Sequence, residues 1–236
     1  MQFFGRKLRH ELKYYIHSHD YAALRQRLSA TLTLDGNSGS PDGYGIRSLY
    51  FDGPHNHALY DKSHGIFSRE KYRIRIYNGS DRTIKLERKS KYGDYVCKEA
   101  ARLSRDDYER ILDGDVAGLQ ESKVPLVQDF YRAIAHRGFR PAVIVDYTRE
   151  AYVYDPGDVR ITFDKRLAAA INTYDLFSGH MVMKEALEPA RTIMEIKYNA
   201  FLPDFIRALV QPQTHQRSAI SKYLICREVG IRSEKP

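Results

Sequence analysis

The sequence of 236 residues predicts an α+β fold, an antiparallel eight-stranded β-barrel tunnel with helices packed on its outside. Six stretches place charged side chains, mostly Arg and Lys with a few Glu, at every second position between apolar ones: 9–15, 72–77, 85–89, 147–149, 159–163 and 194–198. Because side chains on a strand alternate between its two faces, each stretch has one charged face and one largely apolar face. Any one of them would suit an exposed strand, but six together favour a closed sheet whose charged side lines a basic tunnel.

The first half of the chain has the pattern of one helix followed by a β-meander. A strand at about 9–16 leads into a helix that Asp20 is suited to cap, and a glycine-rich loop follows at 35–45. Further strands are expected at 46–52, 71–77, 83–89 and 95–101. The sequences Asn78-Gly-Ser-Asp and Lys91-Tyr-Gly-Asp suit hairpin turns, so we expect antiparallel pairing.

Helices interrupt the strands in the second half. Ser104 is placed to cap one helix, and Pro125 opens another that ends before Gly138. The next strands are expected at 141–154, 159–163 and 193–198, the first two joined by the turn Asp155-Pro-Gly-Asp. Apolar spacing then predicts helices at 202–210 and 219–226, with Ser218 or Ser221 near a cap.

The composition fits a single folded domain over residues 1–236, since 42% of the residues are hydrophobic and no Pro/Gly/Ser-rich linker divides the chain. A formal net charge of +8 favours an anionic partner. Two cysteines provide neither a metal-binding spacing nor a disulfide framework, which fits a reducing compartment. Without a signal peptide or a transmembrane run in the sequence, we expect a soluble cytoplasmic protein.

Arg73 and Arg75 are the sharpest candidates for phosphate binding. Two positions apart on a strand, their guanidinium groups point the same way at a spacing of ~7 Å, which suits neighbouring phosphates. Three glutamates, Glu11, Glu87 and Glu195, each lie two residues from a lysine on the same face. They either form structural ion pairs or ligate a hard divalent cation, Mg²⁺ or Mn²⁺, together with phosphate oxygens.

Several common enzyme classes are excluded by their missing motifs. The chain contains no P-loop sequence, no Gly-x-Gly-x-x-Gly dinucleotide motif and no nucleophile elbow of a serine hydrolase. Phosphoryl transfer remains open, because it depends chiefly on positioning and charge stabilisation rather than on a protein nucleophile.

Ordered motifs connect these residues to a known family. From the N-terminus they are Arg-His-Glu-Leu-Lys-Tyr, Ser-Leu-Tyr-Phe-Asp, Tyr-Arg-Ile-Arg-Ile-Tyr, Leu-Glu-Arg-Lys, Val-Asp-Tyr-Thr-Arg, Val-Arg-Ile-Thr-Phe-Asp, Met-Glu-Ile-Lys-Tyr and Ser-Lys-Tyr. In this order they resemble the VTC domain, the polyphosphate polymerase module of the vacuolar transporter chaperone complex. That domain belongs to the triphosphate tunnel metalloenzyme (CYTH-like) superfamily, and the resemblance spans nearly the whole chain.

The resemblance implies a tunnel that holds polyphosphate or a nucleoside triphosphate and uses a divalent metal. The residues it implies for transfer of the γ-phosphate are Lys13, Arg73, Arg75, Lys89, Arg149, Arg160 and Lys222. Arg88 competes with Lys89 if that strand is rotated. Substrate binding is implied for Lys98, Tyr147, Lys197 and Ser221, and Glu195 resembles the metal-binding glutamate, with Glu11 and Glu87 as further candidates.

Two departures from the family pattern bear on activity. The eukaryotic polymerase has a basic residue two positions before the C-terminal serine, where this chain has Ala219, and Arg217 or His215 are candidates to compensate. The hydrolytic branch of the superfamily begins with Glu-x-Glu-x-Lys, where this chain has Arg9-His-Glu-Leu-Lys. Arginine in place of the first glutamate favours the polymerase-like branch, because fewer acidic groups remain to activate a water.

The leading hypothesis is therefore a metal-dependent phosphotransferase that extends phosphate or polyphosphate from ATP. Hydrolysis of tripolyphosphate or a nucleoside triphosphate is the first alternative, and a non-catalytic sensor of polyphosphate or inositol polyphosphates is the second. We expect no nucleic-acid partner, since a lumen barely wide enough for side chains cannot accept a duplex. The sequence leaves open the acceptor, the metal, the oligomeric state and a membrane-protein partner.

Overall fold

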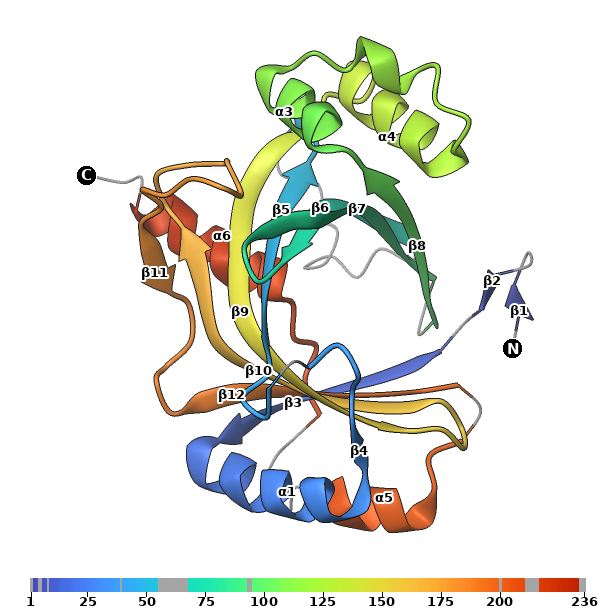
Figure 1. Ribbon diagram of the computed structural model, residues 1–236, viewed down its shortest axis with the longest axis vertical. Helices are drawn as coiled ribbons and strands as arrows, with labels where there is room; N and C mark the ends of the chain where they lie inside the picture. The colour runs from blue at the N-terminus through green and yellow to red at the C-terminus, as the bar shows by residue number, and fades with distance from the viewer. Residues whose placement is uncertain are drawn as a thin grey trace.

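One curled antiparallel sheet organises the chain, as the sequence predicted (Figure 1). The computed structural model describes residues 2–3, 6–7, 9–38, 40–54, 68–92, 95–199, 201–210 and 217–233. Its main path contains eight strands, in the order β3 (His10–His17), β12 (Arg191–Tyr198), β10 (Val159–Ala170), β9 (Arg140–Tyr154), β5 (Tyr44–Asp52), β6 (Ser68–Tyr77), β7 (Ser80–Tyr92) and β8 (Tyr95–Leu103).

The sheet curls until its two edge strands approach each other. Figure 1 shows β6, β7 and β8 arching over β3, β10 and β12. Among the residues that the structure describes, the edges do not join by a continuous ladder, but an isolated antiparallel bridge links Arg9, beside β3, to Val96 of β8. The shape is thus that of an eight-stranded barrel in which one seam is paired only locally.

Strand register explains why the charged positions share the inner face. On one half of the sheet, Glu195 pairs with Lys13 and with Thr162, while Lys197 pairs with Glu11. On the other half the paired positions are Arg73 with Glu87, Arg75 with Lys85, and Lys71 with Lys89. Because directly opposed residues of paired strands lie on the same face, the alternating charges of six separate segments face one space.

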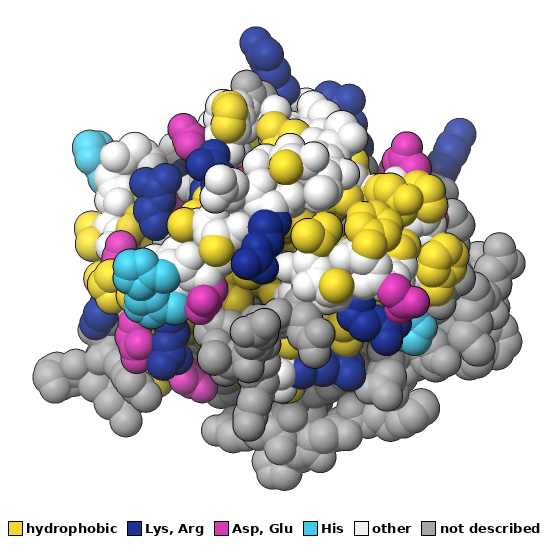
Figure 2. Space-filling view, turned by 90° about the horizontal axis from the view of Figure 1, so that it is seen from below, with side chains coloured by type: hydrophobic (Ala, Val, Ile, Leu, Met, Phe, Trp, Pro, Cys, Tyr) yellow, Lys and Arg dark blue, Asp and Glu magenta, His cyan; other side chains and the backbone are white. Residues whose placement is uncertain are grey.

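Helices cover the apolar outer face in two groups. Below the sheet in Figure 1 lie α1 (Ser18–Thr31) and α5 (Asp204–Val210), which pack on β3, β10 and β12. Leu28 of α1 and Ile206 of α5 share one hydrophobic cluster with Phe163 of β10. Above it, α3 (Arg105–Asp113), the 3-10 helix η2 (Ala117–Leu119) and α4 (Pro125–Ala135) cover β5 to β8, with Phe130 in contact with Phe51 and Tyr72. Seen from below, the outer surface mixes both charge signs, with hydrophobic side chains gathered on one side (Figure 2).

The last helix, α6 (Lys222–Ser233), differs from the others because it packs against the inner face of the sheet. Its Tyr223 and Cys226 are buried with Tyr50, Val143 and Val145, which share the face of the charged positions. Part of the barrel interior is therefore a hydrophobic core, and the remaining inner surface is left to the charged side chains.

Turn and cap sequences account for most element boundaries. Asn78 and Gly79 both adopt positive φ and form the tight β6–β7 turn, and Ser104 makes a capping box with Asp107. The expectation that Asp20 caps the first helix was wrong: β3 continues through His17, whose side chain accepts from His19 N and caps α1, so Asp20 lies in the first turn. The final helix begins at Lys222, directly after Ser221, rather than at 219.

Four strands were not predicted because each has only two or three residues. They are β1 (Gln2–Phe3) and β2 (Arg6–Lys7), which pair with each other, β4 (Thr33–Leu34), which pairs with β9, and β11 (Met183–Glu185), which pairs with β10. Residues 93–94 of the predicted second hairpin turn lie outside the described residues. Among the helices that the structure describes, none is long and apolar enough to cross a membrane.

A buried carboxylate on the outer face of β9 fixes α1 to the sheet. Glu150 is fully buried and accepts hydrogen bonds from Tyr21 OH at 2.6 Å, Arg25 Nε at 3.0 Å, Tyr152 OH at 2.6 Å and Lys165 Nζ at 3.0 Å. Burial alone would raise the pKa of Glu150, but these donors hold that pKa below its ordinary value.

We predict that Glu150→Gln lowers the free energy of unfolding by about 2 kcal/mol, because an amide leaves Arg25 and Lys165 without their anion. A lowered folded-state pKa gives stability that is complete above about pH 4.3 and is lost as pH falls through the folded value. The difference between wild type and variant in urea unfolding should thus shrink below pH 4. Glu109→Gln, in an exposed ion pair with Arg105, is the matched control and should change stability little; equal effects of both variants would contradict the prediction.

Candidate functional site

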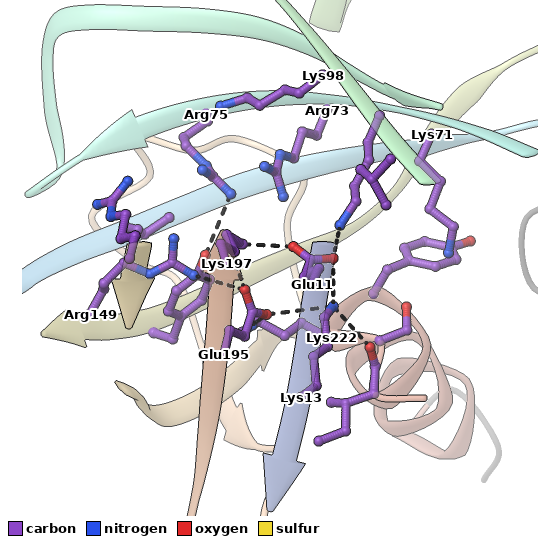
Figure 3. A pocket seen from close by; sticks show the side chains of 18 of the residues that line it. Glu11, Lys13, Lys71, Arg73, Arg75, Lys98, Arg149, Glu195, Lys197 and Lys222 are labelled. Atoms are coloured by element: carbon purple, nitrogen blue, oxygen red, sulfur yellow. Dashed lines mark hydrogen bonds and ion pairs between the residues drawn. The ribbon is translucent and has the colours of Figure 1, made fainter. Parts of the chain in front are cut away.

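A cavity of about 1280 Å³ lies inside the curled sheet. Fourteen Lys and Arg residues line it but only two Glu, so its surface strongly favours a polyanion. Every residue predicted for the site except Glu87 lines this cavity: Lys13, Arg73, Arg75, Lys89, Lys98, Tyr147, Arg149, Arg160, Lys197, Ser221, Lys222, Glu11 and Glu195. Sequence segments as distant as 11–13 and 221–222 thus meet in one space, and Figure 3 shows the central part of it.

Glu195 is the most heavily engaged anion of the site. From β12, its Oε1 accepts from Lys222 Nζ at 2.6 Å and lies 3.5 Å from Lys13 Nζ, while its Oε2 accepts from Lys197 Nζ at 2.8 Å. Burial raises the pKa of a carboxyl, but these lysines and Arg149 hold the pKa of Glu195 well below its usual range. The carboxylate therefore stays ionised and joins strands β3 and β12 to helix α6.

Glu11 lies beside Glu195 and shares two of its lysines. Lys13 and Lys197 are 3.6 and 3.5 Å from the Glu11 carboxylate, and Lys89 Nζ reaches across from β7 to donate to its Oε2 at 2.7 Å. Figure 3 shows Glu11 and Glu195 on adjacent strands, facing the arginines of the opposite wall. This Lys89–Glu11 contact connects the two halves of the barrel across the cavity.

The opposite wall carries Arg73 and Arg75, which Glu87 holds from behind. Arg73 donates to Glu87 Oε2 at 2.7 Å and to Tyr50 OH at 2.8 Å, and Arg75 Nη1 lies 3.6 Å from the same carboxylate. Lys98 also pairs with Glu87. Because one buried carboxylate balances three cations, the guanidinium groups are held in place and keep a net positive charge toward the cavity.

The three predicted glutamates do not meet as one metal-binding cluster. Among the described residues, no group of three or more His, Cys, Asp or Glu side chains is arranged to hold a metal ion. Glu87 is engaged by three cations on the opposite wall, whereas Glu11 and Glu195 face one space. Two carboxylates without a histidine or cysteine among the described cavity-lining residues suit a hard cation that takes its other ligands from phosphate and water.

The sequence reasoning did not identify Asp164, although this residue orients two of the predicted ones. Asp164 is fully buried on β10, accepts from Arg149 Nε and Nη2 at 2.6 and 2.7 Å, and lies 2.5 Å from Lys222 Nζ. It follows Arg160 and Thr162 at the same two-residue spacing, so strand alternation was sufficient to place it on the charged face.

Two further lysines of the cavity were also missed. Lys71 precedes Arg73 by two positions and lies 4.4 Å from the centre of the Tyr223 ring, and Lys85 pairs with Arg75 across β6 and β7. Lys85 lies inside the recognised stretch 85–89 but was given no role, whereas Lys71 lies one position before the stretch 72–77, at the start of the expected strand.

Two ambiguities of the sequence are resolved by side-chain direction. Lys89 lines the cavity, whereas Arg88 points to the outer face, where it donates to Glu99 and Asp129. Near the C-terminal helix, Arg217 lines the cavity beside Ala219, so a cation is present on that segment. His215, the other candidate to replace a basic residue there, lies outside the described residues.

The lysines of the cavity differ in how firmly they hold their protons. Burial and the neighbouring charge of Lys13 lower the pKa of Lys89 to about 7, and burial together with Arg73 and Arg75 lowers the pKa of Lys98 to about 8. In contrast, burial would lower the pKa of Lys13, but Glu195 and Glu11 raise it above its ordinary value. Near neutral pH, Lys13 therefore keeps its proton, whereas Lys89 and Lys98 titrate.

Comparison with known proteins connects this geometry to one family. The sequence matches the family model described as "VTC domain" over residues 8–230. A solved structure of a candidate adenylate cyclase from Vibrio parahaemolyticus is similar, with 13% identity, coverage of 93% of this chain and 98% of that chain, and a TM-score of 0.51. At such low identity the likeness concerns the fold alone.

Two further structures are similar with lower TM-scores. A protein from Pyrococcus horikoshii is 15% identical, with coverage of 97% of this chain and 99% of that chain and a TM-score of 0.47. The capping-enzyme triphosphatase of Mimivirus is 12% identical, with coverage of 88% of each chain and a TM-score of 0.43. No curated protein matches the sequence of this chain.

We predict that between pH 6 and pH 8 the wild type loses about tenfold more affinity for inorganic tripolyphosphate than a Lys89→Arg variant does. A pKa near 7 means that Lys89 is charged at pH 6 and largely neutral at pH 8, so binding at pH 8 must first protonate it. Calorimetry in buffers of different ionisation enthalpy should record uptake of about one more proton by the wild type than by Lys89→Arg at pH 8. Identical pH profiles for the two proteins would contradict the assignment.

Proposed function

Since this chain belongs to the VTC domain family, we propose that it is a phosphotransferase that extends an inorganic phosphate or polyphosphate chain with the γ-phosphate of ATP. The observation that carries the proposal is the cavity itself, in which cations approach one buried space from both halves of the sheet and from α6. A cavity of about 1280 Å³ exceeds the roughly 300–1,000 Å³ of typical ligand pockets, which leaves room for a donor and an acceptor together.

In the proposed reaction, a terminal oxygen of the acceptor phosphate attacks the γ-phosphorus of ATP. A new P–O bond forms with the acceptor's electron pair, the bond from the γ-phosphorus to the β,γ-bridging oxygen breaks, and ADP leaves with that electron pair. The acceptor oxygen is already ionised at neutral pH, so the reaction needs no general base. The protein's task is to align two polyanions that repel each other, which a cation-lined cavity does.

The two walls have separate tasks in this scheme. Arg73 and Arg75, fixed by Glu87, bind phosphate oxygens from the β6 side with forked guanidinium groups. Arg149 and Lys222, both held by Asp164, and Lys13 face them from the other side. Because charge accumulates on the transferring group and on the departing ADP, donors that are already oriented stabilise the transition state without reorganisation.

Glu195 and Glu11 are the residues that would hold a divalent cation, Mg²⁺ or Mn²⁺. When bound, such a cation would neutralise phosphate charge and help to orient the triphosphate. The carboxylates are now paired with lysines, so Lys13 and Lys197 would have to turn toward the phosphates when the cation and substrate enter together.

The state of the carboxylates favours transfer over hydrolysis. Hydrolysis requires a base for the attacking water, yet Glu11 and Glu195 have pKa values far below neutrality, since burial, which would raise them, is outweighed by the neighbouring lysines. Arg9 lines the cavity at the position where hydrolytic relatives have a further glutamate. An ionised phosphate acceptor needs no such base, whereas a water does.

We predict that Arg75→Lys reduces chain synthesis by about 100-fold or more, because lysine keeps the charge but cannot make the forked contact. Purified protein would be incubated with ATP and Mn²⁺ or Mg²⁺, and the products resolved on a gel for long phosphate chains and assayed for free phosphate. Arg47→Lys, on the outer face of β5 beside Asp146, is the control and should leave synthesis unchanged. Release of free phosphate without any chains would contradict the proposal and favour hydrolysis as the function.

We predict that Glu195→Gln abolishes turnover but does not weaken binding of tripolyphosphate measured without metal, because removing an anion from the cavity cannot reduce its attraction for phosphate. A melting curve with tripolyphosphate present checks that the variant folds. Unchanged turnover by folded Glu195→Gln would refute the metal assignment. Tight polyphosphate binding by a wild type that never turns over would favour the sensor alternative.

A further inference from the structure

The two ends of the cavity differ in chemistry. At one end, the turn after β4 contributes Asn37, the start of β5 contributes Tyr44, and the end of β6 with its turn contributes Tyr77 and Asn78; we call these four residues the tyrosine mouth. Arg82 and Lys85 of β7 line the cavity beside them, and Lys85 Nζ lies 5.5 Å from the centroid of the Tyr77 ring. At the other end of β6 the lining residues are Lys71 and, opposite it, Lys89.

Strand register places the tyrosine mouth next to the phosphate-binding arginines. Tyr77 follows Arg73 and Arg75 on the same face of β6, at steps of ~7 Å, as their regular pairing with β5 shows. Tyr44 is directly paired with Arg149 on the neighbouring strand β9. A molecule whose phosphates lie on these arginines would therefore place the group beyond its last phosphate against Tyr77.

Tyr77 offers an accessible ring, and Tyr44 supports it. The Tyr77 side chain is half-buried, whereas Tyr44 is buried, and their ring centroids are 6.2 Å apart. Arg160 holds Tyr44 in place by donating to its hydroxyl at 3.0 Å, and Arg160 in turn pairs with Asp35. The three other tyrosines of the cavity lining, Tyr50, Tyr147 and Tyr223, are all buried, and Tyr50 and Tyr223 lie against each other.

The turn beside Tyr77 is fixed in position rather than left to adjust. Asn78 N donates to Gly45 O at 3.0 Å, and Gly45 N donates to Asn78 Oδ1 at 2.7 Å, so the tip of the β6–β7 hairpin is tied to the start of β5. The start of β5 is in turn close to β9, which requires Gly43: this residue has φ +94°, and a Cβ there would lie 2.1 Å from Arg149 O. With its oxygen engaged, the Asn78 amide presents its Nδ2 group as a donor.

We propose that the tyrosine mouth binds the nucleoside of the triphosphate donor, with the base stacked on Tyr77 and polar contacts from Asn37 and Asn78. This inference rests on the proposed function, because it names the nucleoside part of the same donor. A planar base on a tyrosine ring is a sequence-tolerant contact, so the mouth selects nucleoside triphosphates over inorganic chains rather than one base over another. It also orients the donor, with its γ-phosphate pointing toward Lys71 and Lys89.

The test compares ATP with inorganic tripolyphosphate in binding to the full chain without turnover. We expect Tyr77→Ala to weaken ATP binding about tenfold while leaving tripolyphosphate binding within about twofold, since only ATP has a base to lose. Tyr77→Phe should bind both ligands as the wild type does. Tyr174→Ala, which removes an exposed tyrosine outside the cavity lining, is the matched control and should change neither affinity.

Two outcomes would overturn the inference: an equal loss of affinity for both ligands, which would assign Tyr77 to the shape of the cavity, or no loss for either. The proposed function fails separately. If the wild type makes no phosphate chains but Tyr77→Ala still weakens the binding of ATP and not that of tripolyphosphate, the nucleoside site stands without the polymerase. If the wild type makes chains and Tyr77→Ala changes the affinities for ATP and tripolyphosphate equally or not at all, only the nucleoside site is refuted.

Discussion

Mutual repulsion among inward-facing lysines and arginines is the constraint on which the rest of this structure depends. A curled sheet whose inner positions carry so many cations would not close unless anions separated them. Glu11, Glu87, Asp164 and Glu195 do this, and each contacts at least two cations. Two of them, Glu87 and Asp164, sit behind the cations rather than in the middle of the cavity, so the positive charge remains available to a ligand.

Incomplete compensation has a thermodynamic consequence. The cavity retains more cations than anions, and burial together with repulsion from these neighbouring cations lowers the pKa values of Lys89 and Lys98. A bound polyanion would relieve this repulsion, so part of its binding free energy comes from removing an unfavourable interaction already present in the empty protein. The inward-facing lysines and arginines, whose repulsion makes closing of the barrel less favourable, thus also make the cavity selective for phosphate chains.

Strand alternation made the inner face predictable, because a period of two assigns each residue to a face without knowledge of the partner strands. This is why Lys13, Arg75 and Glu195 were identified from their own segments. The role of Asp164 and the placement of α6 depend on which segments meet in three dimensions, and a single sequence does not contain that information. The tyrosine mouth escaped notice for another reason: Tyr44 and Tyr77 look like ordinary strand tyrosines until the register places them beside Arg149 and Arg75.

The site is assembled from both ends of the chain, and this links its formation to completion of the fold. Lys13 in the first strand of the barrel donates to Ile220 O, and Lys222 in the last helix contacts Glu195 and Asp164. The core of α6 with Val143 and Val145 holds Lys222 in that place. Before α6 packs, Asp164 and Glu195 lack their strongest common partner, and the inner face has no hydrophobic cover. Packing of α6 therefore completes the hydrophobic part of the barrel interior and places Lys222 in the phosphate-binding part at the same time, because this one helix contributes residues to both.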